Sequence, residues 1–148
     1  MKLYEHESVD NKLFRLKEIS KILDEMRAVS REDFVKEVRT HSAAMFNLLI
    51  GITIILDIGQ HILSHGAQRT ARNYKEVIRM LGEEKIVPAA FAREHENMPS
   101  FRNMLVHEYD KIDLALVYDY IQNSPQTFQK FAAAFVSYMN KIKESGSV

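Results

Sequence analysis

The most apolar part of the chain reads Ala43-Ala44-Met45-Phe46-Asn47-Leu48-Leu49-Ile50-Gly51-Ile52-Thr53-Ile54-Ile55-Leu56. From Phe46 to Leu56 it is apolar on nearly every face of a helix, which requires burial on more than one side. It includes Asn47 and is shorter than the roughly 18 apolar residues that indicate a membrane span. We therefore predict the central helix of a soluble protein, with one face packed on neighbouring helices and another forming a homodimer interface.

The remaining sequence also has helical patterning. It contains only five glycines and three prolines, and its apolar residues recur at spacings of three and four rather than alternating as in a half-buried strand. A length of 148 residues is typical of one domain. We predict an all-α antiparallel helical bundle that forms a single domain over residues 1–148, with a frayed tail at about 145–148.

Local signals divide this bundle into helices. Ser30 and Asp113 are predicted N-caps, and Ser100 is a third candidate. Gly82 is placed to end a helix that has Tyr74 on its inward face, and Ser124-Pro125 is placed to open the last helix. The predicted helices run from after Asp10 to about 26, from 31 to about 64, from 68 to 81, from 89 to about 96, through the segment after Ser100, from 114 to 121 and from 125 onward.

Composition excludes several classes of function. Basic and acidic residues are equal at 20 each, so no global positive field attracts nucleic acid, and any RNA contact must come from local clustering. There is no cysteine, which removes disulfides and thiolate chemistry and fits a reducing compartment. The N-terminal residues carry acidic side chains and no apolar core, unlike a secretory signal. We expect a cytoplasmic protein with no cofactor, no membrane association and no DNA partner.

One local cluster of basic residues falls in the predicted helix 68–81. At 100° per residue, its members lie within about 120° of one another. Two interpretations stay open, a solvated face with ion pairs along the helix and a track for the RNA backbone. The residues are Arg69, Arg72, Lys75 and Arg79.

Arg102 and His107 are the strongest candidates for chemistry. They pair a permanent cation with the side chain that gives or takes a proton near neutral pH. That pair is sufficient for phosphodiester cleavage without a metal, because the imidazole can move a proton while the guanidinium stabilises charge on the phosphorane oxygens. Asn103, four residues before His107, could orient the ring or the phosphate. The spacing alone also fits a surface arginine and a partly buried histidine.

The wider block Phe101-Arg-Asn-Met-Leu-Val-His-Glu-Tyr-Asp-Lys-Ile-Asp113 resembles the core block of the HepT-like ribonuclease toxins of the HEPN superfamily. The run from Leu56 to Leu63 is similar to that family's second long helix. The resemblance implies an all-α HEPN fold, a dimer in which two such motifs meet in one cleft, and metal-independent endoribonuclease activity of a toxin. It also implies a minimal nucleotidyltransferase antitoxin as partner, which transfers AMP to the tyrosine matching Tyr109. Added phosphate charge and bulk there would repel and block RNA.

Helix geometry adds a constraint. On an ideal helix Arg102 and Tyr109 are nearly eclipsed, whereas Arg102 and His107 differ by about 140°. Either the helix unwinds near Glu108 or the catalytic pair is completed across a dimer. The second possibility agrees with the shared cleft of the family.

Further polar residues allow alternatives. Asp57, His61 and His65 are spaced to line one helix face and could hold a metal, but no histidine here follows a glutamate by three residues, as bundle metal sites require. We expect no metal site, and Asp57 with His61 could instead support His107 as a buried polar pair. A non-catalytic HEPN module that binds a nucleotide or docks a nucleotidyltransferase is the alternative function.

Overall fold

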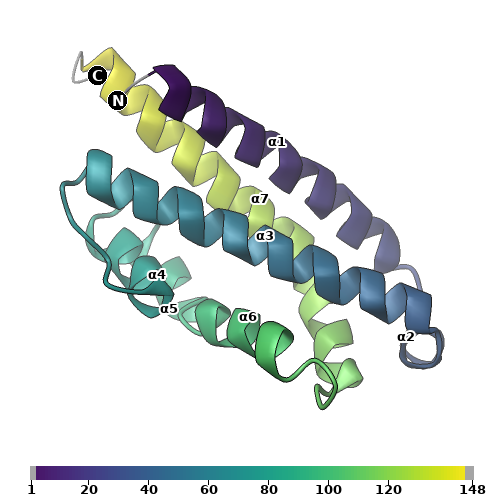
Figure 1. The fold of residues 1–148 in the computed structure, drawn as a ribbon. Coiled ribbons are helices and arrows are strands. Elements are labelled where there is room, and N and C mark those ends of the chain that lie inside the picture. Colours follow the sequence, from purple (N-terminus) through teal and green to yellow (C-terminus); the bar gives the residue numbers. More distant parts are fainter. Residues whose placement is uncertain (1–2, 146–148) are drawn as a thin grey trace.

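The computed structural model describes residues 3–145, and the side chains of residues 8–145. Within this range every regular element is an α-helix (Figure 1). The predicted tail at 145–148 lies outside the described residues except for Ser145. The helices are α1 (Leu3–Met26), α2 (Arg31–Lys36), α3 (Val38–His65), α4 (Tyr74–Glu83), α5 (Ala89–Glu94), α6 (Met98–His107) and α7 (Leu114–Glu144).

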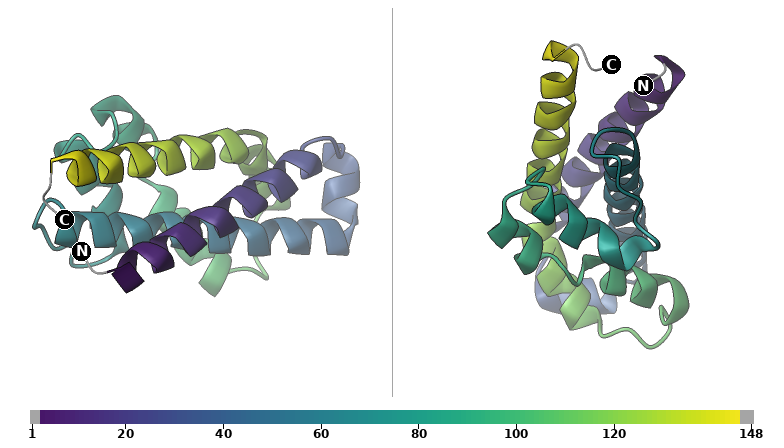
Figure 2. Two further views of the ribbon diagram at one scale, coloured as in Figure 1. Left: turned by 90° about the horizontal axis from the view of Figure 1, so that it is seen from above. Right: turned by 90° about the vertical axis from the view of Figure 1, so that its left-hand side faces the viewer.

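Three long helices form the body of the molecule. α1 runs antiparallel to α3 and α7 (Figure 1), and each of the three packs against the other two. Figure 2 shows α1 crossing α7 at an angle, so the two separate toward the end where the chain begins and finishes. Gly51 of α3 leaves room for the Phe128 ring of α7, which brings these two helices close together. The all-α bundle predicted from the apolar periodicity is confirmed.

The apolar stretch from Ala43 to Leu56 lies in the middle of α3. By length and composition alone α3 could cross a membrane, since its most apolar 18-residue window has a mean hydropathy of 1.8, but 56% of that window is buried inside the structure. α1, α4, α6 and α7 all contact this helix. Burial by neighbouring helices accounts for its apolar character.

Two predicted N-caps are confirmed. The Ser30 hydroxyl accepts a hydrogen bond from the Asp33 amide at 3.2 Å, and the Asp113 carboxylate accepts one from the Ala115 amide at 2.9 Å. The prediction for Ser100 is wrong, because α6 begins earlier, at Met98, with Pro99 in its first turn. A proline there costs no hydrogen bond, since the first amides of a helix have no partner within it.

Several predicted boundaries are also wrong. α1 begins at Leu3, before Asp10. The helix predicted from 31 to about 64 is interrupted at Glu37, whose backbone is extended. This break lets α2 turn so that Phe34 is fully buried against the Tyr118 ring, at a centroid distance of 5.3 Å.

Two further predictions, based on proline and glycine, are wrong. Pro125 lies inside α7, which continues from 114 to 144, because Ile121 and Phe128 on either side of it are both fully buried in the core. Gly82 lies inside α4 rather than ending it. A Cβ atom at Gly82 would stand 2.5 Å from the Cβ atom of Ala92, so glycine is needed for the close contact of α4 with α5.

Candidate active site

The segment with the strongest candidates for chemistry forms α6. It packs on α3, its residues Phe101 and Leu105 are buried, and the Phe101 ring stacks on Tyr120 of α7 at a centroid distance of 4.0 Å. These contacts fix the rotation of α6 about its axis. Arg102 consequently lies half-buried between α6 and α3.

The Arg102 side chain is held on three sides. Its Nε–H donates to the Thr53 hydroxyl of α3 at 3.1 Å, and its Nη1 donates to the Asn103 side-chain oxygen at 3.2 Å. The guanidinium carbon lies 5.1 Å from the centre of the Tyr74 ring, within the range of a cation–π contact. Thr53 donates its own hydrogen to the Leu49 carbonyl at 2.8 Å, which leaves the hydroxyl oxygen free to accept from Arg102.

The Tyr74 hydroxyl donates in turn to the Asp57 carboxylate, at 2.5 Å. Burial, followed by this hydrogen bond, raises the pKa of Tyr74 from 10.0 to about 12. The phenol therefore stays protonated, and a donor, at neutral pH. We call the five residues Thr53, Asp57, Tyr74, Arg102 and Asn103 the Arg102 site.

No ion pair with a carboxylate is formed by Arg102 within the part of the chain that the structure describes. Its direct partners are a hydroxyl, an amide oxygen and an aromatic ring, all uncharged. The side chain is thus fixed in place while its positive charge is left unneutralised. That combination suits the binding of an anion.

α6 ends at His107, and Glu108 caps it with its amide bonded to the Met104 carbonyl at 2.9 Å. The helix therefore unwinds at Glu108, which is one of the two alternatives that the helix geometry left open. Completion of the catalytic pair across a dimer stays a prediction. His107 is exposed, and among residues 8–145 its side chain has no hydrogen-bond partner. Tyr109 follows in the loop before α7 with 66% of its surface exposed. The imidazole and the phenol are both accessible to another molecule.

Comparison with known proteins identifies the family of this chain. The family model of the HepT-like ribonucleases matches residues 15–135, a range that includes every residue of the Arg102 site, His107 and Tyr109. The chain belongs to the HepT-like ribonuclease family. One relative of this HepT-like chain is the tRNA nuclease HepT of Aphanizomenon flos-aquae, which is 26% identical over 133 residues, or 88% of this chain and 90% of the relative.

Two solved structures have the same fold as the HepT-like chain. The tri-AMPylated HEPN toxin of Shewanella oneidensis, in complex with the MNT antitoxin, matches with a TM-score of 0.78 and 18% identity over 87% of this chain and 96% of that one. The cytosolic protein of unknown function YutE from Bacillus subtilis matches with a TM-score of 0.79 and 20% identity over 92% and 91%. The predicted HEPN fold is confirmed.

Residues predicted to support the site take particular positions in this HepT-like chain. Asn103 contacts the Arg102 guanidinium, and Asp57 joins the site through Tyr74. The His61 ring stacks on His65 at a centroid distance of 4.3 Å. Within the part of the chain described here, no group of three or more histidine, aspartate or glutamate side chains is arranged to hold a metal. A supporting role of Asp57 and His61 toward His107 stays a prediction.

Sequence reasoning misses two members of the Arg102 site. The helical spacing of Tyr74 indicates only a core residue, and Thr53 lies within the apolar stretch. The one available signal is that Thr53 is a hydroxyl residue among aliphatic neighbours. Its partner on α6 is 49 positions away, and no local pattern relates residues at that separation.

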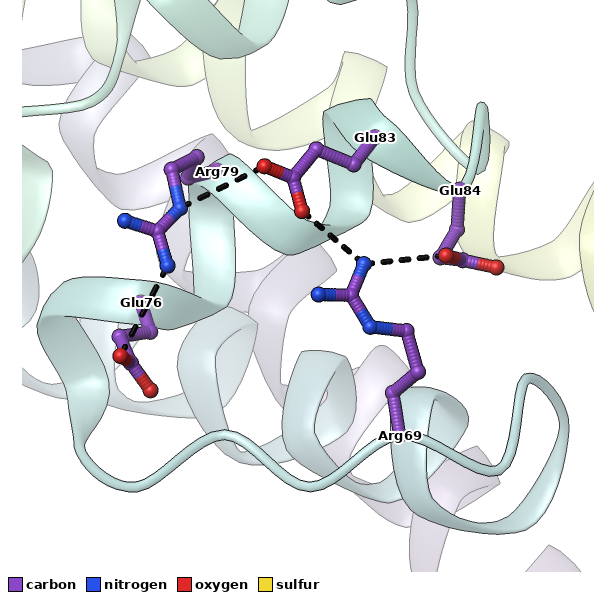
Figure 3. Close-up of polar contacts among 5 residues, drawn as sticks. All are labelled: Arg69, Glu76, Arg79, Glu83 and Glu84. Atoms are coloured by element: carbon purple, nitrogen blue, oxygen red, sulfur yellow. Dashed lines mark hydrogen bonds and ion pairs between the residues drawn. The ribbon is translucent and has the colours of Figure 1, made fainter.

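The predicted basic helix face is not formed. α4 begins at Tyr74, so Arg69 and Arg72 lie in the preceding loop. Arg69 donates to Glu83 at 2.9 Å and to Glu84 at 3.0 Å (Figure 3). These contacts favour the interpretation of paired surface charges over that of an RNA track. RNA binding by the four basic residues stays a prediction.

Arg79 belongs to the same group of charges. Its Nη2 lies 3.7 Å from a carboxylate oxygen of Glu76, and its Nε lies 3.6 Å from a carboxylate oxygen of Glu83 (Figure 3). The hydrogen bonds that Arg69 donates to Glu83 and Glu84 raise the pKa of Arg69. We call these residues the Arg69–Arg79 cluster; its members are Arg69, Glu76, Arg79, Glu83 and Glu84.

Proposed function

We propose that this chain is the toxin of a toxin–antitoxin pair and acts as a metal-independent endoribonuclease. The observation that carries the proposal is the Arg102 guanidinium, held by uncharged groups and unneutralised, on the same helix as the exposed His107. A relative with 26% identity is a tRNA nuclease, which supports RNA as the substrate. We expect activity in the cytoplasm.

The proposed reaction is transfer of the phosphoryl group to the adjacent ribose hydroxyl. The 2′-oxygen attacks phosphorus and the bond from phosphorus to the 5′-oxygen breaks. The 2′-hydroxyl loses its proton to a base, and the leaving 5′-oxygen gains a proton from an acid. His107 is either this base or this acid. Arg102 stabilises the negative charge that develops on the non-bridging oxygens. Neither role needs a metal.

A homodimer would let Arg102 of one chain act with His107 of the other. One face of α3 carries residues spaced three or four apart, namely Phe46, Ile50, Thr53 and Asp57. The Phe46 side chain on this face is 54% exposed. An exposed apolar side chain on the same helix face as Thr53 supports a dimer interface beside the Arg102 site. Light scattering at micromolar concentration should give twice the mass of one chain, and a monomer would contradict the dimer.

The cleavage test compares wild-type protein with Arg102→Ala and His107→Ala in the presence of EDTA. Wild-type protein should cleave RNA to products with a 5′-hydroxyl, and both variants should lose nearly all of this activity. Equal cleavage by all three would indicate a contaminating nuclease. Lack of cleavage together with tight binding of ATP or AMP would favour the non-catalytic module instead.

Mixing the two inactive variants tests whether the site is shared between subunits. If Arg102 of one chain acts with His107 of the other, a mixed dimer contains one intact site. Random exchange should then restore about a quarter of wild-type activity, since half of the dimers are mixed and each has one of two sites. A mixture that stays inactive would place the pair within one chain.

Tyr109 is the proposed target of a minimal nucleotidyltransferase antitoxin. Its phenolic oxygen would attack the α-phosphorus of ATP, lose its proton and release pyrophosphate, which leaves AMP on the tyrosine. The 66% exposure of Tyr109 and the AMPylated state of the Shewanella oneidensis toxin support this assignment. The added phosphate would repel and obstruct RNA near His107.

Intact-mass measurement tests the modification. Protein produced together with a minimal nucleotidyltransferase should gain mass in multiples of one AMP residue and lose RNase activity. Tyr109→Phe should show no gain, whereas Tyr138→Phe, which removes a half-buried phenol elsewhere in the chain, should still gain mass. Modification that persists in Tyr109→Phe would identify another acceptor.

A further inference from the structure

We propose that Tyr74, together with Thr53, is a positioning residue that orients the Arg102 guanidinium so that its two Nη atoms face the RNA phosphate. The inference rests on the proposed ribonuclease function and adds two residues to it. Neither residue belongs to the segment from Phe101 to Asp113. Both act on the reaction only through Arg102.

The hydrogen bonds determine which edge of the guanidinium is available. An arginine side chain has five N–H donors in a planar group. The Thr53 hydroxyl accepts a hydrogen bond from Nε–H, and the Asn103 side-chain oxygen accepts one from Nη1. The three remaining N–H groups lie on the two Nη atoms, which is an edge that binds two phosphate oxygens at once. The Thr53 bond therefore selects the orientation in which this edge is presented.

Tyr74 restricts the remaining motion. Its ring contacts the guanidinium at 5.1 Å, and the ring itself is held by the bond from its hydroxyl to Asp57 of α3. A leucine at this position would remove both contacts, whereas a phenylalanine would keep the ring and lose only the Asp57 bond. The two contacts of Tyr74 can thus be separated by substitution.

The Arg69–Arg79 cluster explains how Tyr74 is kept in place. Tyr74 is the first residue of α4, directly after the loop that contains Arg69 and Arg72. Arg69 ties this loop to the far end of α4 through Glu83 and Glu84 (Figure 3), and the Arg72 amide donates to the Glu76 carboxylate at 2.9 Å. The paired charges hold the loop against α4, so the start of the helix is fixed.

Tyr118 provides a matched control. Its hydroxyl donates to the Val29 carbonyl at 2.8 Å, and Arg31 lies over its ring at 5.4 Å. Tyr118 thus makes the same two kinds of contact as Tyr74, but the arginine on its ring is paired with Asp119 at 2.6 Å and is not part of the Arg102 site. Substitutions at Tyr118 measure the general cost of losing such contacts.

The activity test measures kcat and KM for RNA cleavage in four variants. Tyr74→Leu should lower kcat/KM about 100-fold, because a displacement of about 1 Å in a catalytic group can cost that much. Tyr74→Phe should lower it about threefold to tenfold, in line with a single lost hydrogen bond. Tyr118→Leu and Tyr118→Phe should retain wild-type kcat/KM. Equal losses at the two tyrosines would overturn the positioning role.

A second measurement does not depend on cleavage. The Arg102 Nε–H proton should give a slowly exchanging NMR signal in wild-type protein, weaker protection in Tyr74→Leu and rapid exchange in Thr53→Val, with no change in Tyr118→Leu. An Arg102 signal that is the same in every variant would overturn the inference even if RNA is cleaved. If protection is lost in these variants but the wild-type protein cleaves no RNA, the positioning of Arg102 is supported and the proposed function is overturned. If Tyr74→Leu fails to fold, Tyr74→Phe and Thr53→Val provide the same comparison.

Discussion

Two arginine environments both include residues of α4, and they differ in what surrounds the charge. In the Arg102 site, a hydroxyl, an amide oxygen and an aromatic ring hold the guanidinium. In the Arg69–Arg79 cluster, Arg69 meets two carboxylates and Arg79 meets two, with Glu83 shared between them. The first arrangement fixes a cation and preserves its charge for a ligand. The second uses the charge to hold the protein's own backbone.

Removing each arginine should give the largest contrast. Arg102→Ala is expected to lower kcat for RNA cleavage about 100-fold to 1,000-fold, as loss of a group that stabilises transition-state charge does. Arg69→Ala should change kcat less than about twofold, because the bond from the Arg72 amide to Glu76 still holds the loop against α4 and single surface substitutions have small effects. Single-turnover cleavage measures both. A large loss in Arg69→Ala with unchanged protection of the Arg102 Nε–H would mean that the cluster contacts RNA after all.

Introducing a carboxylate should make the Arg102 site resemble the cluster. Thr53→Asp puts a negative charge beside the guanidinium, and we expect a loss of at least about tenfold in kcat/KM, since hydrogen bonds to charged groups are worth about 1.5–3 kcal/mol. Thr53→Asn supplies a neutral acceptor of similar size and should keep most of the activity. Equal activity of the two variants would show that neutral partners are not required.

The converse change frees the charge of the cluster. The double variant Glu83→Gln/Glu84→Gln leaves Arg69 without its carboxylates, and we expect it to bind uncleavable 2′-O-methyl RNA severalfold more tightly. The slope of log affinity against log salt should steepen by about 0.7 for each additional phosphate of single-stranded RNA that the variant binds. An unchanged slope would mean that Arg69 lies too far from bound RNA to reach a phosphate.

The smallest expected effect concerns the Tyr74 phenol. Burial, and then Asp57, raises its pKa to about 12, so the neutral form is favoured in the folded state. Its contribution to stability is therefore complete below about pH 10 and is lost as the pH rises toward 12. NMR titration of the Tyr74 ring carbon, assigned with Tyr74→Phe, measures the shift. Asp57→Asn should lower this pKa part of the way toward 10, and no change would exclude Asp57 as a cause.

Features within a few residues of one another were predictable. Ser30 and Asp113 each bond to an amide two or three positions ahead, so their capping roles depend on local sequence alone. The rotation per residue along α6 left two alternatives open, and a helix end near Glu108 was one of them. Helices with apolar stripes were predictable for the same reason, since burial selects the spacing of three and four.

Predictions failed where distant segments decide local structure. Pro125 was expected to open a helix, yet the buried residues on either side keep α7 continuous. Gly82 was expected to end a helix, yet it is required by the approach of Ala92 from α5. Ser100 was a sound cap candidate, but α6 begins two residues earlier. In each case a local preference of about 1–3 kcal/mol is outweighed by packing between helices.

The sequence by itself determined the all-α fold and two of the helix caps, because periodicity and capping are short-range properties. Through its resemblance to a family motif it also predicted the residues from Arg102 to Tyr109 as the place for chemistry. Only the tertiary structure decided what surrounds those residues. It brought Thr53, Asp57 and Tyr74 to Arg102 and surrounded Arg69 with glutamates. The charge left on an arginine depends on partners up to 49 positions away, and only the packing of α3, α4 and α6 specifies them.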